Sequence, residues 1–287
     1  MLMDHYTKNL EDWKKASEIS AKALEYGKTL VVKGANALEI CKKIDEMIID
    51  LGGSPAFPAQ ISLNETAAHF CPIEDVILSN EVVKLDVGAE FNDAIGDNAA
   101  TIDLSGKNED LVKASQEALN EAIKIIKPGL KIKEIGKVIS ETIKKHGFRP
   151  VSNLSGHGLD YNSIHCPPTI PNYDNGNENE LEEGMIFAIE PFATDGAGKI
   201  YEGGEATIFS QTAMRPVRNP SERLILNDID KYKGKPFSMR DLAEKYSLPK
   251  VKIALKGLDR QDIIRSYPPL IEVDKGLVSQ AEHTVLV

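Results

Sequence analysis

Two aspartates in the segment Lys84–Asp103 are spaced so that they could hold a metal ion. The segment predicts a β-hairpin, because an apolar run leads into a polar turn and a second apolar run leads out. If the turn is centred on Phe91-Asn92, Asp86 lies directly opposite Asp97 on one face. Two carboxylates this close repel each other unless a proton or a cation lies between them. Asp and Asn are also common in solvated turns, so this segment alone leaves both interpretations open.

Two glutamates interrupt apolar strand sequences nearer the C-terminus. Glu190 lies within Met185–Ala193, and Glu282 lies among β-forming residues in Leu277–Val287. A lone carboxylate in such a strand is costly to bury without a partner, which favours a functional role for both. Alternation along the terminal strand predicts one shared face for Val278, Gln280, Glu282 and Thr284.

Three of the six histidines, His69, His157 and His165, lie beside or close to glycine or proline in the sequence. Gly156 and Gly158 would allow unusual dihedral angles around His157. A single histidine of this kind is more often a hydrogen-bonded loop residue than a ligand. Four carboxylates with one imidazole, however, form an oxygen-rich set that suits Mn, Fe, Co or Zn at a hydrolytic centre. Their four negative charges would balance two divalent cations, which bridging carboxylates hold about 3.5–4 Å apart.

Amphipathic helices and strands that could position these residues occur twice along the chain. Apolar spacing predicts helices at Leu10–Tyr26, ending at Gly27, and at Ala35–Leu51. A similar pair follows about 98 residues later, where Lys113-Ala-Ser-Gln matches Lys15-Ala-Ser-Glu. We therefore expect an α+β fold of two pseudo-symmetric halves with one common sheet. Helices would cover one face of the sheet and leave the other face free to carry a site.

The overall composition excludes several classes of protein. No run of the 287 residues approaches the roughly 18 apolar residues of a membrane span. The segment Met1–Asp12 lacks the apolar core of a signal peptide. Three separated cysteines without a CxxC pair indicate reduced thiols and a cytoplasmic location, and exclude a sulfur-based structural zinc. A net charge of −10 disfavours DNA binding. We expect a monomer with neither DNA nor membrane as partner.

The segment Arg215–Arg265 has a different character. Its 13 Lys and Arg against 7 Asp and Glu give a charge of +6, which leaves −16 on the rest of the chain. Ser238 is predicted to cap a short helix, Met239–Tyr246, and a second helix follows a turn. This order of elements is typical of a helix-turn-helix or winged-helix unit.

The order of these residues resembles the methionine aminopeptidases. The motifs that carry the resemblance are Asp86–(10 residues)–Asp97, Ser155-Gly-His157, Phe187-Ala-Ile-Glu190-Pro-Phe and Gln280-Ala-Glu282-His-Thr. It extends from Pro55-Ala-Phe-Pro to the C-terminus and implies the pseudo-symmetric pita-bread fold. The basic segment and the Ser266-Tyr-Pro-Pro-Leu that follows are similar to the helical subdomain of type 2 enzymes, which type 1 enzymes lack. A polybasic N-terminal extension is missing, as in short archaeal-style members.

The resemblance implies two domains and a set of metal ligands. The domains are a catalytic pita-bread domain, residues 1–214 plus 266–287, and a basic helical insert, residues 215–265. The implied ligands of two divalent ions are Asp86, Asp97, His157, Glu190 and Glu282. Asp97 and Glu282 would bridge both ions. Asp86 would chelate one ion, and His157 and Glu190 would bind the other.

The resemblance also implies substrate-binding residues. His69 and His165 would contact the substrate or stabilise the tetrahedral oxyanion. The implied lining of the methionine pocket is Phe57, Ile164, Phe192 and Tyr267. An aromatic pocket favours a thioether side chain, since sulfur and aromatic rings make favourable contacts.

The implied function is metal-dependent removal of the initiator methionine from peptides and nascent proteins with a small second residue. A hydroxide activated by the two ions would attack the scissile carbonyl. Glu190 would carry a proton from the water to the leaving amine. Co, Mn, Fe and Zn all suit the ligands.

Two other functions stay open at this stage. One is an X-Pro aminopeptidase of the same fold, although such relatives lack the helical insert. The other is a non-catalytic pita-bread protein that binds RNA or the ribosome, although the ligand positions are intact here. The insert could itself make a transient contact with ribosomal RNA near nascent chains. The interpretation that it forms a wall of the substrate pocket is favoured.

Overall fold

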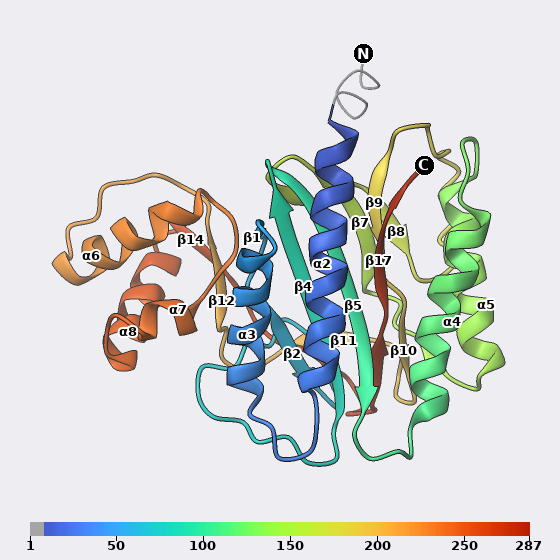
Figure 1. Cartoon of the computed structure of the whole chain (residues 1–287), viewed down its shortest axis with the longest axis horizontal. Helices are drawn as coiled ribbons and strands as arrows, with labels where there is room; N and C mark the ends of the chain where they lie inside the picture. The colour runs from blue at the N-terminus through green and yellow to red at the C-terminus, as the bar shows by residue number, and fades with distance from the viewer. Residues whose placement is uncertain (1–8) are drawn as a thin grey trace.

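The computed structural model describes residues 9–287, so most of the N-terminal segment predicted to lack a signal-peptide core lies outside it (Figure 1). An eight-stranded antiparallel sheet forms the centre, in the order β1-β4-β5-β17-β9-β7-β8, with β2 also paired to β4. Its strands are β1 (Ser54–Pro55), β2 (Gln60–Leu63), β4 (Val82–Phe91), β5 (Ala94–Asp103), β7 (Ser155–Asp160), β8 (Ser163–Pro171), β9 (Ile186–Ile189) and β17 (Glu282–Leu286). Within residues 9–287, no helix is long and apolar enough to cross a membrane.

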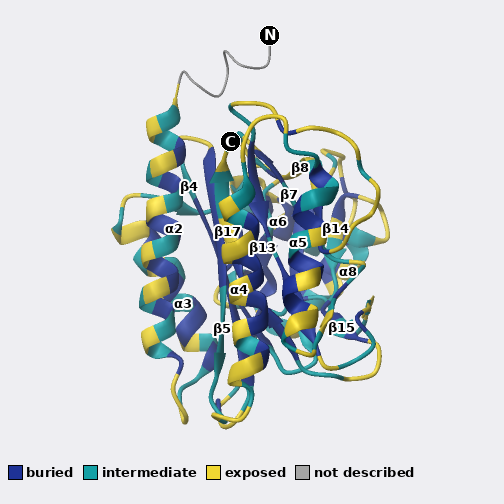
Figure 2. Cartoon of the chain, turned by 90° about the vertical axis from the view of Figure 1, so that its right-hand side faces the viewer, coloured by how far each residue is buried: buried dark blue, intermediate teal, exposed yellow. Residues whose placement is uncertain are grey.

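Four helices cover one face of this sheet, as Figure 1 shows. They are α2 (Leu10–Leu30), α3 (Ala37–Asp50), α4 (Glu109–Ile125) and α5 (Ile132–Lys145). The first pair packs on β4 and the second on β9, which gives two separate apolar cores. Each helix turns its buried side to the sheet and its exposed side to solvent (Figure 2). The prediction of two α+β halves with helices on one face is confirmed.

The first helix is longer than predicted. We expected it to end at Gly27, but α2 continues through this residue to Leu30. A Cβ atom at Gly27 would lie 2.6 Å from Cδ1 of Ile44 in α3. This glycine therefore permits close helix packing and does not mark a helix end.

Two smaller three-stranded sheets flank the centre, in the orders β16-β10-β6 and β11-β15-β3. Their strands are β3 (Thr66–Ala68), β6 (Arg149–Pro150), β10 (Phe192–Thr194), β11 (Ile200–Glu202), β15 (Leu270–Glu272) and β16 (Val278–Gln280). The predicted strands Met185–Ala193 and Leu277–Val287 each divide at their glutamate into a strand of the central sheet and a strand of a smaller one. Val278 and Gln280 thus belong to β16 and Glu282 to β17, and not to one continuous strand as predicted. Pro191 cannot donate a ladder hydrogen bond, which ends pairing beside Glu190.

The basic insert packs around a third apolar core. It contains α6 (Pro220–Ile229), a 3-10 turn (Asp230–Tyr232), α7 (Met239–Ala243) and α8 (Leu248–Asp259). A sheet in the order β13-β12-β14 borders it, made of β12 (Ile208–Gln211), β13 (Phe237–Ser238) and β14 (Ile264–Tyr267). Ser238 caps α7 as predicted, because its Oγ accepts a hydrogen bond from the backbone N–H of Arg240 at 3.0 Å. Helix α6 was not predicted from the sequence, and α7 ends three residues before the predicted Tyr246.

A buried ion pair joins the insert to the first half of the molecule. The guanidinium of Arg240 in α7 contacts the carboxylate of Asp45 in α3, and Arg240 is only 4% exposed. The other carboxylate oxygen of Asp45 accepts a hydrogen bond from the N–H of Ala59 at 3.0 Å. Removal of one partner from such a pair leaves a buried charge without compensation.

We predict that Arg240→Met lowers the free energy of unfolding by about 3–5 kcal/mol at pH 8. The double variant Asp45→Asn with Arg240→Met should recover most of this loss, because the buried charge of Asp45 is removed as well and Asp241, the other partner of Arg240, is partly exposed to solvent. Urea unfolding measures both, with the exposed Arg260→Met as the control. An Arg240→Met protein as stable as the wild type would show that the pair does not stabilise the junction.

Candidate metal centre

The hairpin of β4 and β5 places its two aspartates on one face, although its predicted register is wrong. The turn consists of Asn92-Asp93, whose φ angles of 50° and 69° suit a tight hairpin turn. Asp86 is consequently opposite Ala99, and Asp97 is opposite Gly88. This register differs from the predicted one by two residues, and strand side chains alternate with a period of two. The two aspartates are therefore diagonal neighbours on the same face.

Polar contacts of β5 and β17 fix the strands that carry the site. The Oγ of Ser20 in α2 accepts a hydrogen bond from Nδ2 of Asn98 at 2.9 Å. The Oδ1 of Asn98 lies 2.6 Å from Nδ1 of His283. The hydroxyl of Thr284 also accepts from the N–H of Asp97 at 2.7 Å. These contacts hold β5 and β17 in register, so that Asp97 and the adjacent glutamate point to the face opposite the helices.

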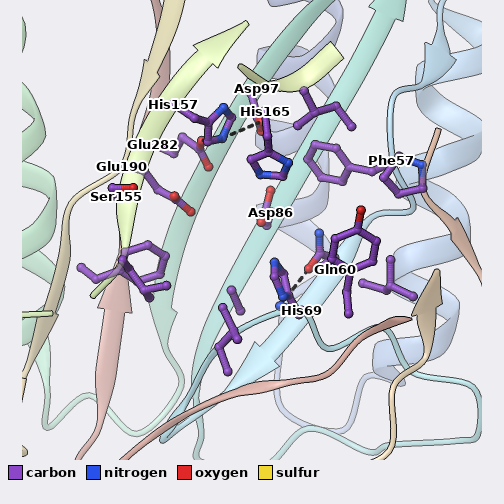
Figure 3. Close-up of a pocket in the computed structure, with 18 of the residues that line it drawn as sticks. Phe57, Gln60, His69, Asp86, Asp97, Ser155, His157, His165, Glu190 and Glu282 are labelled. Atoms are coloured by element: carbon purple, nitrogen blue, oxygen red, sulfur yellow. Dashed lines mark hydrogen bonds and ion pairs between the residues drawn. The ribbon is translucent and has the colours of Figure 1, made fainter. Parts of the chain in front are cut away.

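All five predicted metal ligands line one cavity on that face (Figure 3). Ligand atoms of Asp97, His157 and Glu282 lie within 4.8 Å of one another, and so do those of Asp86, Glu190 and Glu282. Nε2 of His157 is 3.8 Å from Asp97 and 3.8 Å from Glu282. Glu282 belongs to both groups, as a bridging ligand must. Glu190 is grouped with Asp86, whereas the sequence assignment pairs it with His157.

The chemistry of this cluster fits divalent cations. Asp86, Asp97 and Glu282 each have a buried oxygen without a hydrogen-bond partner among the described residues, and such burial is costly unless a cation satisfies it. Burial raises the pKa of Asp86 to about 7. Burial and neighbouring carboxylates also raise the pKa values of Asp97, Glu190 and Glu282. Burial lowers the pKa of His157 to about 3, which keeps its imidazole neutral, as a metal ligand requires.

The same cavity, about 210 Å³ in volume, is lined by all the predicted substrate-binding residues. They are Phe57, His69, Ile164, His165, Phe192 and Tyr267. Gly88 on β4 makes room for one of these side chains, because a Cβ there would lie 2.2 Å from the Phe57 ring. The phenolic oxygen of Tyr267 lies 3.0 Å from Oγ of Ser210, so this ring is also held in place.

Two neutral histidines face the candidate ligands. The ring of His165 lies 4.4 Å from that of His157 between centroids. Burial lowers the pKa of His165 and lowers that of His69 to about 4. His69 has a φ angle of 62°, and its backbone N–H donates to Oε1 of Gln60 at 3.0 Å. Gln60 therefore stabilises the backbone conformation that turns His69 into the cavity.

Two glutamines position site residues although neither role was predicted, and two glycines have a different role from the predicted one. Gln60 gave no signal in the sequence, whereas Gln280 was part of a motif without a role. Its Nε2 donates to Oε1 of Glu190 at 2.7 Å. Gly156 and Gly158 lie in strand β7 without positive φ angles, so the prediction of unusual dihedrals is wrong. Cβ atoms there would lie 2.2 Å from carbonyl oxygens of neighbouring strands, so these glycines permit close strand approach.

Comparison with known sequences identifies similar proteins over nearly the full chain. A family profile described as Metallopeptidase family M24 matches residues 11–229. A methionine aminopeptidase of Archaeoglobus fulgidus is 44% identical over 284 residues, which cover 94% of this chain and 96% of the relative. A methionine aminopeptidase of Thermococcus onnurineus is 43% identical over 278 residues, which cover 95% of this chain and 94% of the relative.

Solved structures show the same architecture. The structure of a thermophilic Arx1 superposes with a TM-score of 0.81 at 20% identity. The match covers 97% of this chain and 88% of the Arx1 chain, and at this identity it shows a likeness of fold alone. A methionine aminopeptidase of Thermotoga maritima has a TM-score of 0.70 at 25% identity, with 98% of this chain and 93% of that chain covered. A prolidase of Pyrococcus furiosus has a TM-score of 0.58 at 28% identity, but the match covers only 65% of this chain and 56% of the prolidase chain. The predicted pita-bread architecture is confirmed.

We predict that Asp86→Asn stabilises the metal-free protein relative to the wild type, by an amount that grows with pH. The pKa of Asp86 is raised to about 7 in the folded chain from an unfolded value near 3.8. The folded state therefore holds a proton that the unfolded chain releases, and wild-type stability falls as pH rises from about 4 to about 7. The difference in Tm between variant and wild type, measured in chelator, should increase over this range.

Addition of Mn²⁺ should reverse the order of the two proteins at pH 7.5, because the wild type gains a ligand that the variant lacks. Loss of the Asp86 charge also lessens the raised pKa values of Asp97, Glu190 and Glu282, which adds to the advantage of the variant in chelator. A difference in Tm that is independent of pH, or equal stabilisation of both by Mn²⁺, would contradict a metal centre at Asp86.

Proposed function

The chain belongs to metallopeptidase family M24, and we propose that it removes the N-terminal methionine from peptides and nascent chains whose second residue is small. One observation carries this proposal: the carboxylate and imidazole cluster and the apolar aromatic residues line the same cavity. The chain is a metal-dependent hydrolase of the aminopeptidase type, as its relatives are named over nearly its whole length. Those relatives are archaeal, in agreement with the type 2 resemblance.

We propose that the cavity holds two divalent ions. Support comes from the two groups of candidate ligand atoms, which have only Glu282 in common. Co, Mn, Fe and Zn all accept oxygen and imidazole ligands of this kind. Such ions would supply Lewis acidity at the scissile carbonyl and lower the pKa of the attacking water.

The residues of the chain would perform the remaining steps. Glu190, oriented by its hydrogen bond from Gln280, would accept a proton from the attacking water and pass it to the leaving amine. His69 and His165 are neutral and can each donate a ring N–H to the oxygen on which negative charge develops. Phe57 and Phe192 would contact the thioether of the substrate methionine.

The alternative functions have less support. An X-Pro aminopeptidase would require a closer likeness to proline-specific relatives, and the prolidase structure covers 65% of this chain. A non-catalytic binding protein would not need five intact ligand positions around one cavity. Comparison of Met-Ala-Ser with X-Pro peptides as substrates separates the two enzymes.

We propose that the insert mainly completes the substrate cavity. Pro236 precedes β13 and lines the cavity, as do Ile208 and Tyr267 of the adjoining strands. A transient ribosome contact is a secondary proposal that rests on the insert's charge of +6 and would show as salt-sensitive co-sedimentation. We also propose a cytoplasmic monomer, which agrees with three free cysteines.

We predict that Asp97→Asn and Glu190→Gln each lower kcat/KM for Met-Ala-Ser by about 10²–10⁴-fold. Met-Ala-Ser should be cleaved faster than Leu-Ala-Ser or Met-Leu-Ser. Calorimetry should show weaker Mn²⁺ binding by Asp97→Asn. Glu117→Gln, on the exposed surface beside His146, serves as the control. Full activity of Asp97→Asn with added metal would rule out this assignment.

A further inference from the structure

A second cavity adjoins the candidate active site on the side of the insert. Its volume is about 640 Å³, and it is lined in part by His69, His165 and Tyr267, which also line the inner cavity. We call this outer cavity the vestibule; its charged walls are Glu202, Lys235 and Arg265. Because the two cavities have walls in common, a peptide whose first residue lies in the inner cavity can continue into the vestibule.

Arg265 has an unusual electrostatic position in the vestibule. Lys235 forms an ion pair with Glu90, whereas Arg265 has no ion pair with any carboxylate of residues 9–287. Its guanidinium carbon lies 5.4 Å from the centroid of the Tyr267 ring, a cation–π contact that leaves its N–H groups free for a ligand. The opposing charge on the vestibule wall, Glu202, is exposed to solvent.

Arg265 is close to groups that face the substrate. Its cation–π partner Tyr267 has its ring centroid 5.8 Å from that of His69, and both rings line the inner cavity. The cation is therefore near the reacting end of the substrate and is not a remote surface charge. In a chain with a net charge of −10, an unpaired arginine at this place favours a negatively charged ligand group.

Strand geometry indicates which part of a peptide would meet this side chain. Arg265 and Tyr267 are two residues apart on β14, so their side chains lie on one face, about 6.6–6.8 Å apart along the strand. An extended peptide advances about 3.3–3.6 Å per residue. The position of Arg265 is thus about two peptide residues farther out than that of Tyr267.

We propose that the vestibule binds the peptide beyond its second residue and that Arg265 selects an acidic side chain at the third or fourth position. This inference rests on the proposed function, since it concerns selection among substrates of that activity. A guanidinium binds a carboxylate through two parallel N–H···O hydrogen bonds, which no neutral or cationic side chain reproduces. Arg265 is a specificity-determining residue in this account, and it takes no part in bond cleavage.

Peptide amides of the form Met-Ala-Ser-Xaa-Ala and Met-Ala-Xaa-Ser-Ala test this proposal, with Xaa as Glu, Gln or Lys. The amide removes the terminal carboxylate as a competing anion. For wild type, kcat/KM should be about fivefold higher with Glu than with Gln at one of the two positions, and lower still with Lys. Arg265→Gln should abolish the difference between Glu and Gln, and Arg265→Glu should favour Lys. Added salt should reduce the wild-type preference.

Arg260→Gln is the matched control, because this exposed arginine lies at the end of α8 and lines neither cavity. It should keep the wild-type preference. Equal kcat/KM for Glu, Gln and Lys peptides in the wild type, or an unchanged preference in Arg265→Gln, would overturn the role of Arg265. Failure to cleave any peptide, Met-Ala-Ser included, would instead contradict the proposed function. Binding of fluorescent Glu and Lys peptides, measured by anisotropy with wild type and Arg265→Gln, would then still decide whether Arg265 selects acidic chains.

Discussion

The structure depends on the mutual repulsion of four carboxylates that line one cavity. Asp86, Asp97 and Glu282 are buried and come from separate strands, whereas the half-buried Glu190 directly follows β9. Each of them raises the cost of ionising its neighbours. No arginine or lysine forms an ion pair with any of them within residues 9–287. The cluster is therefore unfavourable as an isolated feature, and a cation bound among these carboxylates would offset their repulsion.

The remainder of the fold opposes this repulsion from the far side of the sheet. Helices α2 to α5 bury two apolar cores against the face that does not carry the cluster. Beside these cores, the buried side chains of Ser20 and Asn98 form a polar network behind Asp97 with the more exposed His283. Such a network restricts the strands to one register, since a slip of a single residue would turn the carboxylates toward the helices. Stability and site are thus provided by opposite faces of one sheet.

Much of this arrangement could be predicted from the sequence, where it depended on local periodicity. The prediction that Asp86 and Asp97 lie on one face of the hairpin was correct although the turn was misplaced. The pairing register was wrong by two residues, and strand side chains alternate with a period of two. Features set by tertiary contact were not predictable. The division of each glutamate strand depends on a second sheet beside it, and Gly156 depends on how closely Ala188 approaches. Gln60 contacts His69 only after two strands have come together.

The insert illustrates how a segment far from the ligands in sequence can determine what reaches them. Strands β12 and β14 flank it, pair with each other and return the chain to the cavity wall. Strand β14 places Tyr267 in the walls of both cavities. Because side chains alternate along a strand, it also places Arg265, two residues earlier, in the wall of the outer cavity. The buried pair of Arg240 and Asp45 fixes the insert against α3, so these walls keep their positions relative to the metal cluster. In the proposed function, chemistry and selection would thereby be separated: the negatively charged sheet face would hold the metal, and the positively charged insert with its flanking strand would meet the peptide that enters.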